Sequence, residues 1–416
     1  MDTLERTVSA PTLPPTAILS NAAFLRLWVA SGVSAFAFSV AALVEQWYVV
    51  RHLRLDASLG LVMIAGSLPR AVLMVIGGVV ADRVNRFHVL AASFITRGLL
   101  TLSAAALIAM DRFSLAWVVA FALVYGAIDA FFWPARDAAL PDAVEKEQLT
   151  RANSMLLITN QVASVFGPVV GGACVALIGY QSIFLAVGAG LALSAVPLIG
   201  ARDRYSPVRP AKREPLAAAL RAGIAYVLVT PVLRNVMAIQ LATNALFAGP
   251  MMVGLPLVVA NGLHADAIAF SIAQSALAAG MVLAGLFMAW RPQKRRRLAK
   301  MTSYIAVTGV LVAALPHAAS VGSLTVLMGL IGVCIAGNNV AMLALIQEKT
   351  AQDKVGRVMS LNTVGWMGLN PLSVAIFSVF MSLGFGARPL MTAAGLCIAL
   401  VSVVFLCSSA VVRQAD

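Results

Sequence analysis

Long apolar stretches alternate with short polar turns along almost the whole chain. Each stretch holds roughly 20 residues, the length that an α-helix needs to cross the hydrocarbon core of a bilayer. Continuous runs such as Leu59 to Val80 favour helices over the short alternating strands of a transmembrane barrel. The pattern predicts about twelve spans, over residues 24–50, 57–81, 88–110, 114–134, 152–178, 181–200, 232–259, 264–290, 299–318, 320–345, 357–385 and 387–409.

Lys and Arg are unevenly divided between the turns. The odd-numbered turns carry only Arg51, Arg54, Arg112 and Arg388. The even-numbered turns carry Arg83, Arg86, Arg136, Lys146, Arg151, the basic runs within 202–221 and 291–300, Lys349, Lys354 and Arg357. Because cytoplasmic turns are the ones enriched in Lys and Arg, we expect the even-numbered turns and both termini to lie in the cytoplasm.

Composition narrows the class of protein. The 416 residues are 61% hydrophobic and only 11% charged, whereas soluble domains are about 25% charged. The net charge of +13 follows from the cytoplasmic turns and does not require nucleic acid as a partner. The four cysteines have no metal-ligand spacing, and the chain has no phosphate-binding loop or nucleophile elbow. The sequence therefore predicts neither an enzyme nor a metal or cofactor site.

A basic connection with several prolines divides the spans into two sets of six. Within it, Leu216 to Val229 is expected to form an amphipathic helix on the inner membrane surface. Both halves place a Gly near the end of the second span and a proline inside the fifth, as a repeat of six spans would. The expected parts are a cytoplasmic segment 1–23, a bundle 24–200, a cytoplasmic linker 201–231, a second bundle 232–409 and a cytoplasmic tail 410–416.

A charged turn, Gly78-Val79-Val80-Ala81-Asp82-Arg83-Val84-Asn85-Arg86, follows the second span. An acidic residue there contributes nothing to orientation, since Lys and Arg set the bias. Asp82 and Arg86 are four residues apart and are expected to pair across one helical turn. Alternatively, Asp82 faces the start of the eleventh span, where free amide groups create positive potential. The simplest interpretation is that these charges only anchor the turn at the membrane surface.

Span five contains Gly167-Pro168-Val169-Val170-Gly171-Gly172. Small residues let neighbouring helices approach closely, and proline bends a helix. On these grounds alone the run predicts a packing face.

Two further stretches are informative: Phe131-Phe132-Trp133-Pro134-Ala135-Arg136 at the end of span four, and Asp353-Lys354-Val355-Gly356-Arg357-Val358 before span eleven. With the two motifs above, in this order, the chain resembles the major facilitator superfamily of transporters. Within it, the chain is similar to the drug:proton antiporter branch, which includes macrolide-type drug exporters and siderophore exporters. The resemblance implies an all-α integral membrane protein with twelve transmembrane helices in two six-helix bundles.

The resemblance also assigns roles to the motifs. Gly78, Asp82, Arg83 and Arg86 are expected to latch the cytoplasmic side shut. The run Gly167, Pro168, Gly171 and Gly172 resembles a motif of exporters that exchange substrate for protons. The charged turn departs from the family pattern, because Phe87 stands where a basic residue is usual and the second half has no equivalent of Asp82.

Away from the span ends, the first half has four charged residues within its spans: Glu45, Arg70, Arg97 and Asp129. Charge inside a bilayer is costly and usually faces a partner or a watery cavity. Asp129 and then Glu45 are the proton-coupling candidates, because burial disfavours the charged form of a carboxyl group. The alternatives are an interfacial position for Glu45 and a structural pair between Arg97 and Asp129. Arg70 is a candidate for gripping an anionic group, or else it pairs with Glu45 or with a polar backbone group.

The second half offers amides instead of charges. Asn244, Asn338 and Asn339 are the candidates for the substrate cavity, since the resemblance places spans seven and ten beside it. The alternative for each amide is a hydrogen bond that joins two helices, the usual role of amides in membranes.

These observations predict a monomeric secondary transporter in a bacterial inner membrane. We expect it to export a small amphiphilic molecule, of drug or siderophore type, by proton antiport and alternating access. Its partners are the substrate, protons and the lipid bilayer. An importer or a lipid carrier of the same fold is the alternative, and a membrane receptor that transports nothing is a third class.

Overall fold

The computed structural model describes residues 18–53, 58–145, 148–199, 216–290, 296–351 and 354–408, and within these ranges the chain is helical without strands. Of the expected segments 1–23, 201–231 and 410–416, residues 1–17, 201–215 and 410–416 lie outside the described residues. The elements in chain order are α1 Ala22–Trp47, η2 Tyr48–His52, α2 Leu59–Arg83, α3 Arg86–Ala109, α4 Leu115–Ala143, α5 Leu149–Ser194, α6 Val196–Ile199, α7 Leu216–Val229, α8 Pro231–Gly249, η5 Pro250–Gly254, α9 Leu255–Leu257, η6 Val258–Gly262, α10 Ala267–Trp290, α11 Arg297–Ala314, η7 Leu315–His317, α12 Val321–Lys349, α13 Val355–Ser382 and α14 Ala387–Ser408.

In the described part of the chain, nine helices are long and apolar enough to cross a membrane. One of these, Arg151–Ile199, is long enough to contain two membrane-crossing segments, here called passages. The other two passages are the shorter apolar helices Leu59–Met74 in α2 and Gly368–Ser382 in α13. Together they give the twelve spans that the hydrophobic pattern predicts.

The chain reverses direction inside α5 at Gly179, whose backbone angles are φ 75° and ψ 171°. This region of φ favours glycine because it has no Cβ. Before the reversal, α5 runs parallel to α1, since Gly32 lies beside Thr159 and Gly167 beside Ser39. After it, the contact of Gly188 with Leu102 and of Gly98 with Ala192 shows an antiparallel course along α3.

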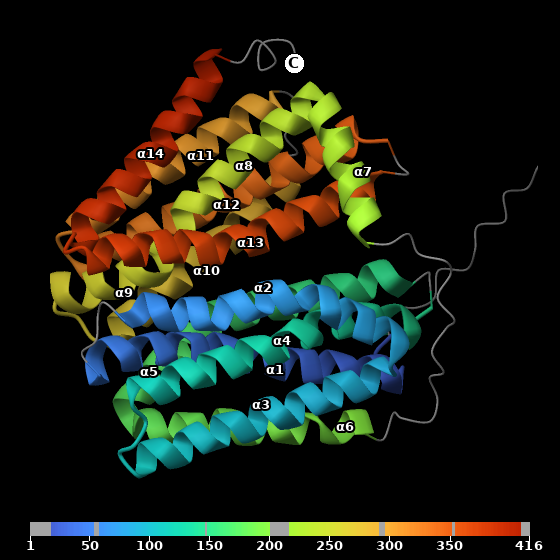
Figure 1. Ribbon diagram of the computed structural model, residues 1–416, viewed down its shortest axis with the longest axis vertical. Helices are drawn as coiled ribbons and strands as arrows, with labels where there is room; N and C mark the ends of the chain where they lie inside the picture. Colours follow the sequence, from blue (N-terminus) through green and yellow to red (C-terminus); the bar gives the residue numbers. More distant parts are fainter. Residues whose placement is uncertain are drawn as a thin grey trace, which may run out of the picture.

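The two halves pair their helices in the same order. In the first half, α1 packs on α5, α2 on α4, and α3 on the second passage of α5. In the second half, α8 packs on α13, α10 on α12, and α11 on α14. Figure 1 shows α1–α6 in the lower part of the view and α7–α14 in the upper part. The structure thus contains the repeat of six spans of which the sequence shows only traces.

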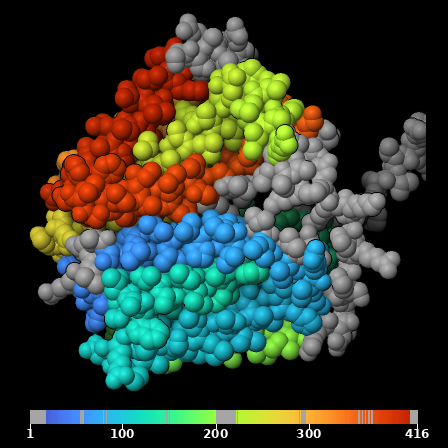
Figure 2. Space-filling view, in the orientation of Figure 1, coloured from blue at the N-terminus to red at the C-terminus, as the bar shows by residue number. Residues whose placement is uncertain are grey.

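One apolar cluster joins the two halves at one end of the molecule, which we call the joined end. It combines Val44 and Trp47 of the first half with Val258, Phe270 and Phe377 of the second. Trp47 and Phe270 stack with ring centroids 5.4 Å apart. The pairs α2 with α13 and α5 with α10 connect the halves, and Figure 2 shows α2 in blue lying along α13 in orange-red.

At the opposite, separated end, each half has a cluster of its own. The first contains Phe24, Phe94 and Leu140 and consists of residues of the first half alone. The second, with Met237 and Ile346 among its members, is built from residues of the second half. Within the described residues, each half is therefore packed independently at this end.

Residues Leu216–Val229, where the sequence predicts an amphipathic helix, form helix α7. Its Tyr226 hydroxyl accepts a hydrogen bond of 3.3 Å from the Ala351 amide. The Lys354 ammonium lies 4.6 Å from the centre of the Tyr226 ring. These contacts join α7 to the turn between α12 and α13.

The crossing of α2 and α4 has no room for a side chain at Gly126, since a Cβ there would collide with the Gly66 carbonyl. Overpacking of this kind costs about 1–3 kcal/mol. Gly126→Ala should therefore lower the melting temperature of the purified protein in nanodiscs.

Gly190→Ala is the matched control, because a Cβ at Gly190 meets open space. Equal melting temperatures for the two variants would contradict the described crossing.

Candidate functional site

A cluster of three charges lies inside the first half. Asp129 of α4 is 1% exposed, and its Oδ1 lies 3.2 Å from Nη1 of Arg97 on α3. Its Oδ2 lies 3.0 Å from Nε of Arg70 on α2 and accepts a 3.1 Å hydrogen bond from Nε1 of Trp133. One carboxylate therefore serves two guanidinium groups. The cluster keeps a net positive charge when all three groups are ionised.

The glycine crossing explains how these side chains meet. Gly66 of α2 and Gly126 of α4 bring the two helix backbones into contact. Arg70 follows Gly66, and Asp129 follows Gly126, by about one helical turn along parallel helices. Both side chains therefore project from the same level of the crossing.

Aromatic rings complete the surroundings of the buried arginine. The Arg97 guanidinium lies 4.2 Å from the centre of the Phe132 ring and 5.2 Å from that of Phe94. Ring faces attract cations, more strongly where water is excluded. The aromatic stretch that ends span four thus has a physical role, since Phe132 contacts Arg97 and Trp133 binds Asp129.

The structure gives Arg70 an ion-pair partner that the sequence did not suggest. The sequence left a pair with Glu45 or with the backbone open; the guanidinium pairs with Asp129 and also lies in one pocket with Glu45. The Arg70 side chain is still 27% exposed, whereas Arg97 is 1% exposed. The pair between Arg97 and Asp129, considered as an alternative above, is present.

Glu45 lies in a pocket of about 110 Å³ that also contains Arg70 and Tyr125. Met252 of the second half contributes to its wall, so the pocket lies where the two halves meet. Oε1 of Glu45 is buried and has no hydrogen-bond partner among the described residues. A buried carboxylate without a partner is costly, whereas its neutral form is tolerated.

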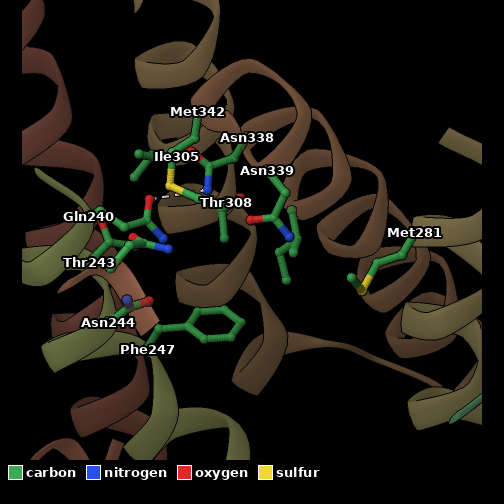
Figure 3. A pocket seen from close by; sticks show the side chains of 12 residues that line it. Gln240, Thr243, Asn244, Phe247, Met281, Ile305, Thr308, Asn338, Asn339 and Met342 are labelled. Atoms are coloured by element: carbon green, nitrogen blue, oxygen red, sulfur yellow. Dashed lines mark hydrogen bonds between the residues drawn. The ribbon is translucent and has the colours of Figure 1, made fainter. Parts of the chain in front are cut away.

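The second half contains a larger pocket of about 420 Å³. It brings together all three amides expected in the cavity, Asn244, Asn338 and Asn339, with Gln240, which the sequence analysis did not select for this pocket. Figure 3 shows Gln240 and Asn338 pointing toward each other from α8 and α12. Nδ2 of Asn338 donates a 3.2 Å hydrogen bond to Oε1 of Gln240.

The charged turn is arranged differently from the expectation. Arg86 does not lie one helical turn after Asp82, because α2 ends at Arg83 and a new helix begins at Arg86. Nη1 of Arg86 binds Oδ2 of Asp142 on α4 and donates to the Ala138 carbonyl at 2.8 Å. The expected latch by the Asp82 side chain lies outside the described residues.

Two other members of the turn face open space in this conformation. Arg83 is exposed, and a Cβ on Gly78 would meet nothing within 4 Å. These two positions therefore face open space at the separated end, whereas Arg86 ties the turn to α4.

The glycine run in α5 contacts both halves. Cβ atoms on Gly167 and Gly171 would meet Ser39 and Val40 of α1. A Cβ on Gly172 would lie 2.5 Å from Oγ of Ser271 on α10. Pro168 lies inside α5 in the same run. The predicted packing face is present, and Gly172 belongs to the contact between the halves.

Arg51 is a functional candidate that sequence reasoning missed. Its Nη2 donates to the carbonyls of Ala260 at 2.9 Å and Ala265 at 2.6 Å. These bonds tie η2 of the first half to the end of η6 in the second. The one available signal was a cation in an odd-numbered turn, where such residues are rare.

Comparison with known proteins gives a consistent family. The model described as Major Facilitator Superfamily matches residues 27–374. The chain is 32% identical over 216 residues to the multidrug efflux pump Tap of Mycolicibacterium fortuitum, a stretch that covers 48% of this chain and 51% of that protein. It is 28% identical over 141 residues to the uncharacterized MFS-type transporter YfiS of Bacillus subtilis, which covers 34% of this chain and 32% of that one. The matches thus span about half, or less, of the relatives' length.

Solved structures share the fold. The POT family transporter PepTSo superposes with a TM-score of 0.75 at 14% identity and covers 95% of this chain and 99% of that one. The nucleoside transporter NupG, solved as a mutant, gives 0.71 at 13% identity and covers 92% and 98%. At such identities the likeness is one of fold alone.

The three-charge cluster predicts a stability effect. Asp129→Asn leaves Arg97 buried without a counter-ion, which should cost about 3–5 kcal/mol. We expect a lower yield of monodisperse protein and a lower melting temperature.

The double variant Arg97→Leu with Asp129→Asn removes both buried charges and leaves Arg70 facing its pocket. It should be more stable than Asp129→Asn alone, a coupling that a double-mutant cycle measures. Additive effects of the two substitutions would contradict the described pair.

Proposed function

The chain belongs to the major facilitator superfamily, and from that premise we propose that it exports a small amphiphilic organic molecule in exchange for protons. The observation that carries this proposal is the Glu45 carboxyl group, whose buried Oε1 has no hydrogen-bond partner among the described residues, in a pocket shared with Arg70 where the two halves meet. Chain identity to a multidrug efflux pump over 216 residues supports export as the direction. A drug or a siderophore remains the proposed class of substrate, and a bacterial inner membrane the proposed location.

The orientation in the membrane follows from charge. The basic turn with Arg83 and Arg86 lies at the separated end, next to Phe87 and Leu90 of the cluster there. Because basic turns stay in the cytoplasm, we place the separated end and both termini inside. The molecule is then closed toward the outside and open toward the cytoplasm, where an exporter collects its substrate.

Within the site we rank Glu45 above Asp129 as the proton carrier. Asp129 has two guanidinium partners within 3.2 Å and holds α2, α3 and α4 together. Oε1 of Glu45 is buried without a hydrogen-bond partner among the described residues, and the pocket that it shares with Arg70 lies where the halves meet. In the cycle that we propose, Glu45 takes up a proton from the outside and carries it through the change of conformation. It releases the proton to the cytoplasm when a hydrogen-bond donor of the substrate replaces it.

The cytoplasmic latch at Asp82 belongs to the opposite conformation. The open space around Gly78 supports a helix contact there that forms only when the separated end closes. In this scheme Asp82 then faces the start of α13, as the family resemblance implies.

A lipid carrier is the second candidate, and one observation favours it. An apolar groove of about 430 Å³ lies between α1 and α5, lined by residues such as Phe36, Val40 and Ile178. Translocation of fluorescent phospholipid in proteoliposomes distinguishes this function from export of a soluble compound.

The exporter proposal predicts energy-dependent extrusion. Cells that produce this chain should extrude at least one member of a panel of dyes, antibiotics and an iron-chelating siderophore, and a protonophore should stop the extrusion. Uptake that rises with the proton gradient would instead establish an importer.

Glu45→Gln removes the group that exchanges the proton but keeps the shape of the side chain. We expect this variant to lose proton-driven extrusion while it still exchanges substrate for substrate in proteoliposomes, since that exchange needs no proton.

Glu348→Gln is the matched control, because Glu348 is 49% exposed and pairs with Arg297 outside both pockets. Normal pumping by Glu45→Gln would exclude Glu45 as the carrier.

A further inference from the structure

The pocket of the second half differs chemically from the charged cluster of the first. Its polar lining consists of amides and hydroxyls, and none of its lining residues carries a charge. Apolar side chains, among them Phe247 and Met342, form the remaining wall. Figure 3 shows the polar groups of α8 facing those of α11 and α12 across the pocket.

One polar atom in this pocket has no partner. Asn338 is 8% exposed, and its Nδ2 is engaged by Gln240. Its Oδ1 is buried without a hydrogen-bond partner in the described part of the chain. A buried amide oxygen without a donor costs free energy, and a ligand that brings a donor recovers it.

Alternative roles explain less of this arrangement. Helix stitching accounts for one bond between Asn338 and Gln240, yet it leaves the second polar atom of Asn338 unused. A charged group in this pocket would lose its hydration without meeting a counter-ion among the lining residues, and that is expensive. A neutral group that both donates and accepts hydrogen bonds has neither difficulty.

We propose that this pocket binds an uncharged part of the substrate that carries several hydroxyl or amide groups attached to an apolar body. The donor of that part completes Oδ1 of Asn338, while Phe247 and the methionines contact the apolar body. This inference rests on the proposed export function, and it names the substrate class: a neutral, hydroxyl- or amide-bearing amphiphile.

Three coumarin probes with one apolar body test the inference. Methylumbelliferyl glucoside is neutral and has hydroxyl donors, methylumbelliferyl phosphate is an anion, and methylumbelliferone methyl ether is neutral without a donor. Equilibrium binding to the full chain in nanodiscs should rank the glucoside above both analogues.

Two variants locate the binding. Asn338→Leu should weaken binding of the glucoside roughly tenfold, the size expected for a buried hydrogen bond and its partner. Thr308→Val keeps the shape of a second lining residue and should weaken binding roughly threefold. Asn153→Leu is the control, since Asn153 is exposed and its side chain bonds to Leu149 of its own helix.

The inference is overturned if the phosphate or the methyl ether binds as tightly as the glucoside, if no probe binds the wild-type chain, or if Asn338→Leu leaves the affinity unchanged. Export of dyes or antibiotics by a chain that fails this test would preserve the proposed function and exclude only the neutral pocket. Binding that depends on Asn338 in a chain that extrudes nothing would support the neutral pocket and exclude the proposed export function.

Discussion

Within the described residues, the arrangement of the two halves depends on one apolar cluster that they share at one end. The stacked rings of Trp47 and Phe270 belong to this cluster. Beside it, Arg51 donates hydrogen bonds to two backbone carbonyls of the other half. At the other end each half has its own core. Two bodies that are packed separately and touch at one end can exchange that contact for one at the opposite end without unfolding either core. This is the physical requirement of alternating access.

The two carboxyl groups inside the spans of the first half differ in how their charge is compensated. Asp129 is held by Arg70, Arg97 and Trp133, so its charge stabilises three packed helices. Glu45 lacks comparable partners on Oε1 and lies where the halves meet. The first group therefore joins helices, and the second is the proton carrier that we propose. The second half has a neutral, amide-lined pocket instead, so the two halves offer a substrate different chemistry.

The hydrophobic pattern was sufficient to predict the spans, because the bilayer imposes both length and composition on each helix. It also suggested the pair between Arg97 and Asp129 as an alternative, since both residues lie at a similar depth on neighbouring spans. The hydrophobic pattern could not predict the ion pair between Arg70 and Asp129, because that contact depends on the close crossing of α2 and α4 at Gly66 and Gly126. Arg51 was missed for a related reason. Its partners are backbone carbonyls of the other half, which have no signature in the sequence.

The central claim, that the two halves alternate between closure at either end, is tested most directly by distances between spin labels. One pair, at Leu61 and Val379, reports on the joined end, where both side chains are exposed. A second pair, at Arg83 and Ala351, reports on the separated end, where both are exposed as well. We predict a short distance at the joined end and a long one at the separated end in the resting protein. A second population with the opposite pattern should grow when the pH or a transported compound is changed. A single distribution at both ends under all conditions would contradict alternating access in this chain.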